Sequence, residues 1–321
     1  MNAVRERIGA LEQIVTPLTA NADFNTYWAE ELRTVREREL GGSRVETKSL
    51  MPTVKAYRVQ FYGADHTPLY GWFLVPDRPG GTDSKLPCAV KFHGYTGNKG
   101  FPEEHADLLM MGMAVFSVDV RGQGGESGNL LPQTFGMATG WVSQGICAKE
   151  ESYYRAVVLD AVRAIDWVSE QPEVDPLRIA AVGSSQGGGL VLLATALNDN
   201  VAAAVALVPN MCRMDWGIMH SVGSVSEVGK LASFYPEKLD DMLDTLSYFD
   251  AVNFAERITV PILVSANLKD MICWPETIFA AYNRIASEDK QRLVDPFIGH
   301  QVSSAQWQSA LTFLAERLQP Y

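Results

Sequence analysis

Six short apolar runs recur along this chain, and they constrain its fold more than any other feature of the sequence. The runs span Cys88–Phe92, Ala114–Val118, Ile179–Val182, Ala203–Val208, Ile262–Ser265 and Leu293–Phe297. Apolar residues without the alternation of a half-exposed strand are typical of strands buried on both faces. The sequence therefore predicts a mainly parallel sheet that helices cover.

Helical segments separate these runs. In the clearest, Ser152–Gln171, apolar residues recur at helical spacing between a capping serine and the helix-breaking Pro172. Further predicted helices span residues 102–112, 188–198, 279–286 and 305–318. Strands that alternate with helices over this length indicate the α/β class and an open, doubly wound sheet.

Three parts of the chain depart from this alternation. Residues 53–61 and 69–75 flank a turn and are rich in aromatic and β-branched side chains, so we expect antiparallel edge strands there. Residues 1–50 are expected to form a helical extension. Residues 210–257 contain no strand-like run and are expected to form an insertion that walls a binding site, mediates assembly or adds surface helices. Without a repeat or linker, residues 1–321 are expected to form one domain.

The composition disfavours several classes of partner. The chain has 321 residues, 47% of them hydrophobic, and a formal net charge of -11, so no basic face is expected for nucleic acid. Its four cysteines are scattered, as is typical of reduced thiols. The N-terminus lacks the pattern of a signal peptide, and the most apolar stretch, residues 187–208, is broken by Asn198, Asp199 and Asn200, so no bilayer-spanning segment is expected. We expect a soluble, cytoplasmic protein with no membrane partner.

The sequence Gly-Ser-Ser-Gln-Gly at Gly183–Gly187 lies between a buried run and a predicted helix. This is the context of a nucleophile elbow, in which a tight strand-to-helix turn exposes the central serine above the sheet. The two glycines let the strand and helix approach closely, and the N-terminus of the helix favours developing negative charge. Ser185 is therefore the predicted catalytic nucleophile.

A serine hydroxyl needs a base to remove its proton, and histidine is suited to this at neutral pH. In enzymes with a nucleophile elbow, the triad residues follow one another along the chain in the order serine, acid, histidine. Of the five histidines, His66, His93 and His105 precede the elbow, and His220 lies in the predicted insertion. His300, in the loop after the last predicted strand, is the expected base; the alternative is a histidine of a surface turn.

The orienting acid should follow the strand at residues 262–265, and Asp270 is our choice. Asp289 and Asp295 remain rivals. Asp289 lies in a charged turn and is expected to be solvated, whereas Asp295 is expected within a strand rather than at its end.

The tetrahedral intermediate requires two oxyanion donors, for which we expect backbone N–H groups. Gln186 directly follows the nucleophile, and Tyr95 lies in the glycine-containing loop after the strand at 88–92. The glycines of this loop could instead simply make a turn. His93 in the same loop is expected to be structural.

A second glycine-rich segment, residues 121–128, lacks the lysine and serine or threonine that end a phosphate-binding loop. We interpret it as a rigid loop in which Arg121 and Gln123 brace the catalytic loops, the alternative being direct contact with substrate. No metal-binding motif occurs, so we expect neither a metal nor another cofactor.

Several motifs together resemble the acetyl xylan esterase/cephalosporin C deacetylase family, carbohydrate esterase family seven. They span nearly the whole chain from residue 20 onward: Ala22–Phe24 with Tyr27 and Trp28, Arg121–Gln123, Gly183–Gly188, Thr245–Asp250 and Phe279–Asn283. The resemblance implies the α/β-hydrolase fold and deacetylation of acetylated xylo-oligosaccharides and cephalosporin-type esters. It places the triad on Ser185, Asp270 and His300 and the oxyanion donors on Tyr95 and Gln186.

The resemblance further implies an intracellular homohexamer whose subunits contact partly through the insertion. Two positions depart from the family pattern: His-Glu is replaced by His300-Gln301, and Cys-Pro-Pro by Cys273-Trp274-Pro275. Both lie beside the predicted triad and bear on loop anchoring and pocket shape. The expected function is hydrolysis of small acetyl esters of sugars or antibiotics through an acyl-enzyme. Alternatives are an acyltransferase, a peptidase or a non-catalytic binding protein of the same fold.

Overall fold

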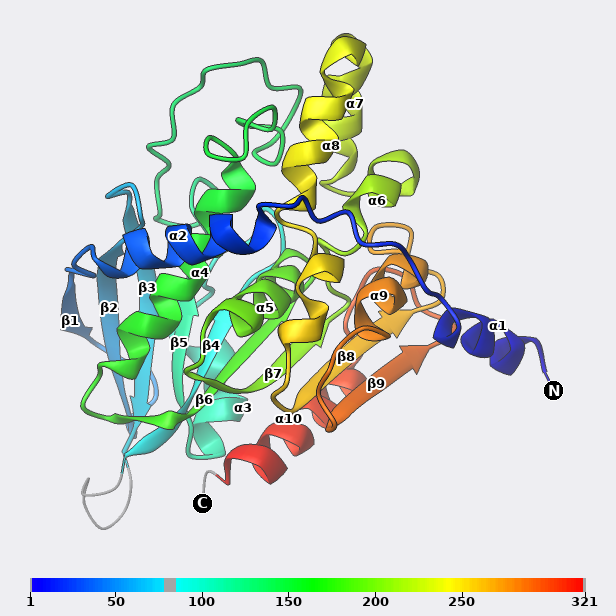
Figure 1. Cartoon of the computed structure of the whole chain (residues 1–321). Coiled ribbons are helices and arrows are strands. Elements are labelled where there is room, and N and C mark those ends of the chain that lie inside the picture. Colours follow the sequence, from blue (N-terminus) through cyan, green and yellow to red (C-terminus); the bar gives the residue numbers. More distant parts are fainter. Residues whose placement is uncertain (1, 78–84, 320–321) are drawn as a thin grey trace.

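The computed structural model describes residues 2–77 and 85–319 and contains one nine-stranded sheet with helices on both faces (Figure 1). The strand order is β1-β2-β3-β5-β4-β6-β7-β8-β9. The first three strands are β1 (Ser43–Thr47), β2 (Val54–Tyr62) and β3 (Pro68–Pro76). β1 pairs antiparallel with β2, β2 with β3, and β3 with β5. The antiparallel edge expected from the sequence is therefore confirmed, with β1 as a strand inside the extension that was expected to be helical.

The remaining six strands are parallel, as the six apolar runs predicted. They are β4 (Leu86–Phe92), β5 (Ala114–Val118), β6 (Val174–Ser184), β7 (Val201–Leu207), β8 (Ile262–Asn267) and β9 (Lys290–Asp295). The last strand begins and ends earlier than the predicted run. Pro296 has no N–H for the ladder, and the Asp295 carboxylate accepts the N–H of Phe297, so the chain turns out of the sheet and leaves Phe297 71% exposed.

Helices form a layer on each face of the sheet. One layer contains α4 (Tyr153–Ser169), α5 (Gln186–Leu197) and α9 (Pro275–Tyr282). The layer on the opposite face contains α3 (Ala106–Met110) and α10 (Ser304–Leu318) (Figure 1). The extension supplies α1 (Ala3–Glu12), which packs on α9, and α2 (Phe24–Arg36), which packs on α4. The 3₁₀ turns are η1 (Pro102–His105), η2 (Pro236–Lys238), η3 (Ala251–Asn253) and η4 (Ala255–Arg257). The α/β-hydrolase fold is thus confirmed.

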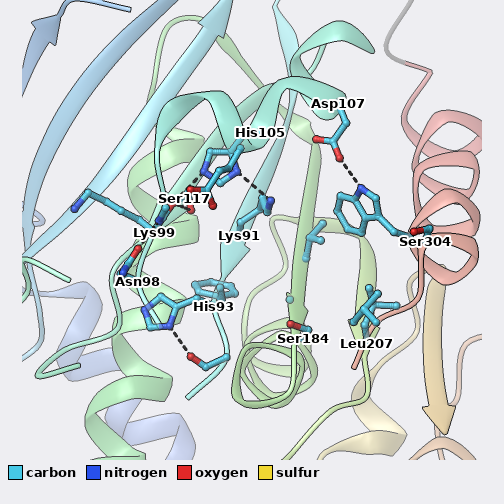
Figure 2. A pocket seen from close by; sticks show the side chains of 18 of the residues that line it. Lys91, His93, Asn98, Lys99, His105, Asp107, Ser117, Ser184, Leu207 and Ser304 are labelled. Atoms are coloured by element: carbon cyan, nitrogen blue, oxygen red, sulfur yellow. Dashed lines mark hydrogen bonds between the residues drawn. The ribbon is translucent and has the colours of Figure 1, made fainter. Parts of the chain in front are cut away.

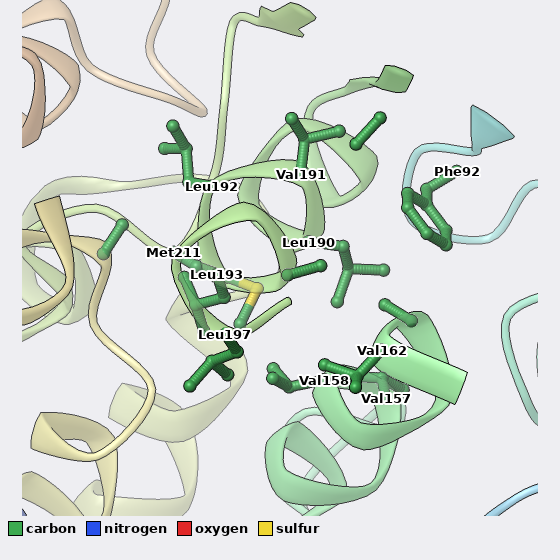
Figure 3. Packing of buried hydrophobic residues seen from close by; sticks show 14 of the residues in the cluster. Phe92, Val157, Val158, Val162, Leu190, Val191, Leu192, Leu193, Leu197 and Met211 are labelled. Carbon is green, nitrogen blue, oxygen red and sulfur yellow. The ribbon is translucent and has the colours of Figure 1, made fainter. Parts of the chain in front are cut away.

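The helix ends follow local sequence signals. Ser152 caps α4 by accepting the N–H of Tyr154, as predicted. The helix expected at residues 279–286 instead begins at Pro275, because proline is favoured in the first turn, where its missing N–H costs no hydrogen bond. Behind the elbow, Leu190 and Leu193 of α5 pack with Val158 of α4 in the buried core (Figure 3). This packing fixes the helix that follows Ser185.

The segment at residues 210–257 forms an insertion between β7 and β8 that contains α6 (Met214–His220), α7 (Ser226–Phe234) and α8 (Leu239–Ser247). A long irregular loop between β5 and α4, residues 119–152, approaches it from the neighbouring side of the sheet (Figure 1). Phe135 of this loop packs edge-to-face on Tyr235, with ring centroids 5.0 Å apart. No helix among the described residues is long and apolar enough to cross a bilayer.

Candidate active site

The predicted elbow is present at the junction of β6 and α5. Ser185 lies between the two elements with φ +56° and ψ −120°, a strained backbone conformation for a residue with a side chain. A Cβ on Gly187 would lie 2.0 Å from the carbonyl oxygen of Phe92, and one on Gly183 would lie 2.5 Å from Gly187. Only glycine therefore lets β4, β6 and α5 meet at this point.

The structure brings the three predicted triad residues together. The Nε2 atom of His300 lies 2.9 Å from the Oγ of Ser185, and its Nδ1 atom lies 2.7 Å from Oδ2 of Asp270. Because a carboxylate only accepts, the Nδ1–H donates to Asp270 and leaves Nε2 to accept the serine proton. This is the arrangement that a general base requires.

Asp270 is held rigidly in the loop that follows β8. Its side chain is buried, and its Oδ1 atom accepts the backbone N–H groups of Ile272 (2.8 Å) and Cys273 (2.9 Å). One carboxylate oxygen is thus used to fold the loop and the other to orient His300.

The rival acids have other partners. Asp289 pairs with Arg317 on α10, and Asp295 accepts the N–H groups of Phe297 and Ile298 at the end of β9. Asp295 is therefore at the end of its strand, contrary to the expectation, but its Oδ1 atom is occupied by the following turn.

The other histidines lie in other surroundings. The Nδ1–H of His93 donates to the Gly94 carbonyl and its Nε2 atom accepts the N–H of Val120, which ties the loop after β4, called here the oxyanion loop, to the segment that follows β5. This agrees with the structural role expected for His93. His66 lies in the β2–β3 turn with φ +62°, and the exposed His220 stacks on Trp216 in α6.

A cavity of about 690 Å³ lies beside the catalytic loops, between β4, η1 and the start of α10 (Figure 2). Inside it, Lys91 donates to Nδ1 of His105 at 3.0 Å, and the Nε2–H of His105 donates to the carbonyl of Lys99. Burial, followed by the charge of Lys91, lowers the pKa of His105 to about 4. The cavity wall includes Ser184 but not Ser185 or His300, so it is distinct from the triad.

Asn267 anchors the His300 loop and was missed by the sequence analysis. Its buried side-chain amide donates to the carbonyls of Gly299 and Gln301, both at 2.8 Å, and its Oδ1 atom accepts from Gln306. The loop is therefore held through its backbone on both sides of His300. This anchoring does not depend on an acidic side chain at position 301.

The two predicted oxyanion residues flank the nucleophile. Gln186 is the first residue of α5, so its N–H has no partner within the helix. In the described part of the chain, the N–H of Tyr95 donates no hydrogen bond within the protein. Gly94, which precedes Tyr95, lies close to the nucleophile, since a Cβ there would be 3.6 Å from the Cβ of Ser185.

Gln123 braces both oxyanion segments. Its carbonyl oxygen accepts the N–H of Thr96 at 2.8 Å, next to Tyr95, and its amide donates to the side chains of Gln186 (2.8 Å) and Tyr153 (2.9 Å). The bracing role expected for Gln123 matches these contacts.

Arg121 supports the site through buried contacts. Its guanidinium is fully buried and forms ion pairs with Asp160 and Asp65, while its carbonyl accepts the hydroxyl of Tyr153. Since every direction of the guanidinium fork meets a carboxylate or hydroxyl, these contacts favour the structural role over substrate binding.

The insertion contacts the oxyanion loop through the side chain of Glu227. The hydroxyl of Tyr95 donates to Glu227 of α7 at 2.9 Å and accepts the N–H of Trp141 at 2.8 Å. A Cβ on Gly140 would lie 2.4 Å from the Glu227 carboxylate, so the three segments meet closely. Of the roles considered for the insertion, these contacts favour a wall of the site. Among the described residues, no cluster of three or more His, Cys, Asp or Glu side chains could hold a metal ion.

Comparison with known proteins gives a consistent set of relatives. The family profile for acetyl xylan esterase (AXE1) matches residues 9–317. The acetyl esterase Axe7A of Xylanibacter ruminicola is 26% identical over 308 residues, which cover 93% of this chain and 68% of that protein.

Solved structures agree with this similarity. The acetyl xylan esterase from Paenibacillus sp. R4 superimposes with a TM-score of 0.93 and 34% identity, over 97% of this chain and 99% of that one. Acetyl xylan esterase 1 from Thermoanaerobacterium sp. JW/SL YS485 gives a TM-score of 0.90 and 27% identity, over 96% and 98% of the two chains. The similarity therefore extends over the strands, the insertion and the N-terminal extension together.

Proposed function

The chain belongs to the acetyl xylan esterase (AXE1) family, and from this premise we propose that Ser185, His300 and Asp270 carry out its reaction. As a member of the family the protein is a carboxylic ester hydrolase that acts on acetyl esters. The observation that carries the assignment of residues is the pair of hydrogen bonds, 2.9 Å and 2.7 Å, that connect Ser185 to Asp270 through His300.

In the first step the Oγ of Ser185 attacks the acetyl carbonyl while its proton passes to Nε2 of His300. The carbonyl oxygen becomes an oxyanion, which the N–H groups of Tyr95 and Gln186 would stabilise together with the N-terminus of α5. Collapse of the intermediate breaks the bond to the alcohol, which leaves with the proton held by His300. Asp270 stabilises the imidazolium throughout.

In the second step water attacks the acetyl group on Ser185. His300 removes a proton from that water, and the bond to Ser185 breaks as His300 returns the proton to its Oγ. Acetate leaves, and the enzyme returns to its starting state without needing a cofactor.

For the substrates, we propose acetylated xylo-oligosaccharides and cephalosporin-type acetyl esters. The family resemblance of the sequence supports this choice, as do the names of the acetyl esterase and acetyl xylan esterases to which the chain is similar. We further propose that the protein is cytoplasmic, which the same resemblance and the scattered free cysteines support. The resemblance also supports a homohexamer as its assembly.

The proposal is tested with chromogenic esters of acetate, butyrate and octanoate. Wild type should hydrolyse the acetate ester fastest, and Ser185→Ala should be slower by about 10⁴-fold or more. Equal rates for the two proteins would contradict the role of Ser185, whereas fastest turnover of octanoate would contradict the preference for a small acyl group.

A further inference from the structure

Three aromatic rings form a cluster between the insertion and the loop that follows Asp270. Trp216 and His220, one turn apart on α6, stack with ring centroids 3.7 Å apart and an interplanar angle of 8°. Trp274, just before α9, lies edge-to-face against Trp216 at 5.5 Å, and its indole N–H donates to the carbonyl of His220 at 3.1 Å. The hydrogen bond and the ring contacts fix the orientation of Trp274.

The cluster is continuous with the catalytic loop. Asp270 holds the backbone N–H of Cys273, the residue before Trp274. The Cys273 thiol is buried, which raises its pKa, and the hydroxyl of Ser185 lies near enough to oppose that shift. Consecutive Cα atoms are ~3.8 Å apart. Trp274 therefore begins one residue away from a side chain that lies beside the nucleophile.

The rings are not buried in the core. Trp216 and Trp274 are half-buried and His220 is exposed, and the surrounding side chains include Met219, Val222 and Met271, which are 70%, 66% and 55% exposed. Val222 and Met271 are joined by a backbone hydrogen bond of 3.1 Å, so the insertion and the catalytic loop form one surface here. A group of exposed apolar side chains beside an active site is typical of a ligand-binding surface.

The proposed reaction determines what should lie on this surface. Because the acetyl group must reach Ser185, the alcohol part of the ester lies farther from the nucleophile, towards the surface of the site. A sugar ring has one or two faces lined by C–H groups, and these pack well on the flat face of an indole. Such contacts combine burial of apolar area with attraction to the electron-rich ring.

We infer that Trp274, held by Trp216 and His220, is a stacking platform for the sugar ring that carries the acetyl group. The inference rests on the proposed function and specifies its alcohol: a pyranose is favoured over a small aliphatic alcohol. It also gives a role to a residue that departs from the family pattern, which has proline at this position.

The test compares two acetyl esters that differ only in their alcohol, acetylated xylobiose and ethyl acetate. For wild type, Trp274→Ala and Trp274→Phe, kcat and KM are measured on both. We expect Trp274→Ala to lower the ratio of kcat/KM for the sugar ester over ethyl acetate by roughly tenfold, mainly through KM, and Trp274→Phe to restore part of it. Phe101→Ala removes a 72% exposed ring outside the cluster and is the matched control, whose ratio should equal that of wild type.

The possible results are distinguishable. If Trp274→Ala lowers kcat/KM equally for both esters, the platform is refuted. Trp274 then supports the loop, or it supports a contact between subunits, and light scattering would reveal the loss of such a contact. An unchanged ratio refutes the platform as well. Failure of wild type to hydrolyse ethyl acetate and the sugar ester would instead contradict the proposed function itself.

Discussion

The Nε2 atom of His300 lies 2.9 Å from the Oγ of Ser185, although 115 residues separate them in the chain. The contact exists because β6 and β9 run parallel in one sheet, so that the elbow after β6 and the loop after β9 emerge at the same edge. Asn267, the last residue of β8, holds the loop, and Asp270, in the segment that follows, holds the imidazole. The triad is thus a product of strand order.

Replacement of the orienting acid should leave the fold intact and remove most of the activity. In Asp270→Asn the side-chain amide favours the wrong imidazole tautomer, and kcat for an acetate ester should fall about 10⁴-fold. Asp289→Asn is the control, because Asp289 is partly exposed and pairs only at the surface with Arg317. Its kcat should stay within about twofold of wild type. A large loss in Asp289→Asn alone would reverse our choice of acid.

The close approach at the elbow predicts a contrast between two glycines. Gly187→Ala would place a Cβ 2.0 Å from the Phe92 carbonyl oxygen, whereas a Cβ on Gly128 meets nothing within 4 Å. Gly187→Ala should lower the melting temperature and abolish hydrolysis, because the backbone must move at Ser185. Gly128→Ala should be nearly neutral in both. Thermal unfolding and acetate release measured on the same samples check this, and a neutral Gly187→Ala contradicts it.

The contact between Tyr95 and Glu227 should affect catalysis through the oxyanion loop. In Glu227→Ala the Tyr95 hydroxyl loses its acceptor, so kcat should fall roughly tenfold with little change in KM for a small acetate ester. Tyr95→Phe should have a similar effect, and the double variant should be no worse than either single one. Glu237→Ala, an exposed residue of the same insertion, serves as the control. Additive losses would show that the two residues act independently.

The ion pair of Asp65 with Arg121 predicts how stability depends on acid. Burial opposes the shift, but the bonds from Arg121 prevail and lower the pKa of Asp65 from 3.8 to about 2. Since the folded pKa is depressed, the carboxylate stabilises the fold above about pH 4, and this stabilisation is lost as the pH falls towards 2.

When the pH is lowered from about 5 to about 3, the free energy of unfolding in urea should fall by about 1 kcal/mol more for wild type than for Asp65→Asn. This is an upper value, because the Asp65 side chain is 29% exposed. Parallel stability curves for the two proteins would show that Asp65 does not contribute to acid sensitivity.

The parts predictable from sequence were those fixed by local pattern. Buried strands are recognisable as apolar runs. The elbow couples a short motif to a strand and a helix, so the sequence alone predicts Ser185 as the nucleophile. His300 and Asp270 followed from chain order and from their positions after strands. The ends of β9 and α9 were misplaced, because the turn made by Asp295 and the start at Pro275 outweigh the apolar pattern.

The parts that escaped prediction depend on contacts between distant segments. Asn267 looked like an ordinary strand end, and its hold on Gly299 becomes visible only when β8 and the last loop lie side by side. Glu227 gave no signal beyond a charge on a helix, since its partner Tyr95 lies 132 residues earlier. Similarly, β1 is short and largely exposed, so it lacks the apolar run by which strands were recognised.

The most direct test of the account is covalent labelling of the nucleophile with a serine-directed fluorophosphonate, followed by mass spectrometry of tryptic peptides. We predict one label per chain, on Ser185 in the peptide from residue 179 to residue 213, with acetate release lost in proportion to labelling. Ser185→Ala should not be labelled. A label on another residue, or full hydrolysis by protein that is completely labelled at Ser185, would contradict the central claim.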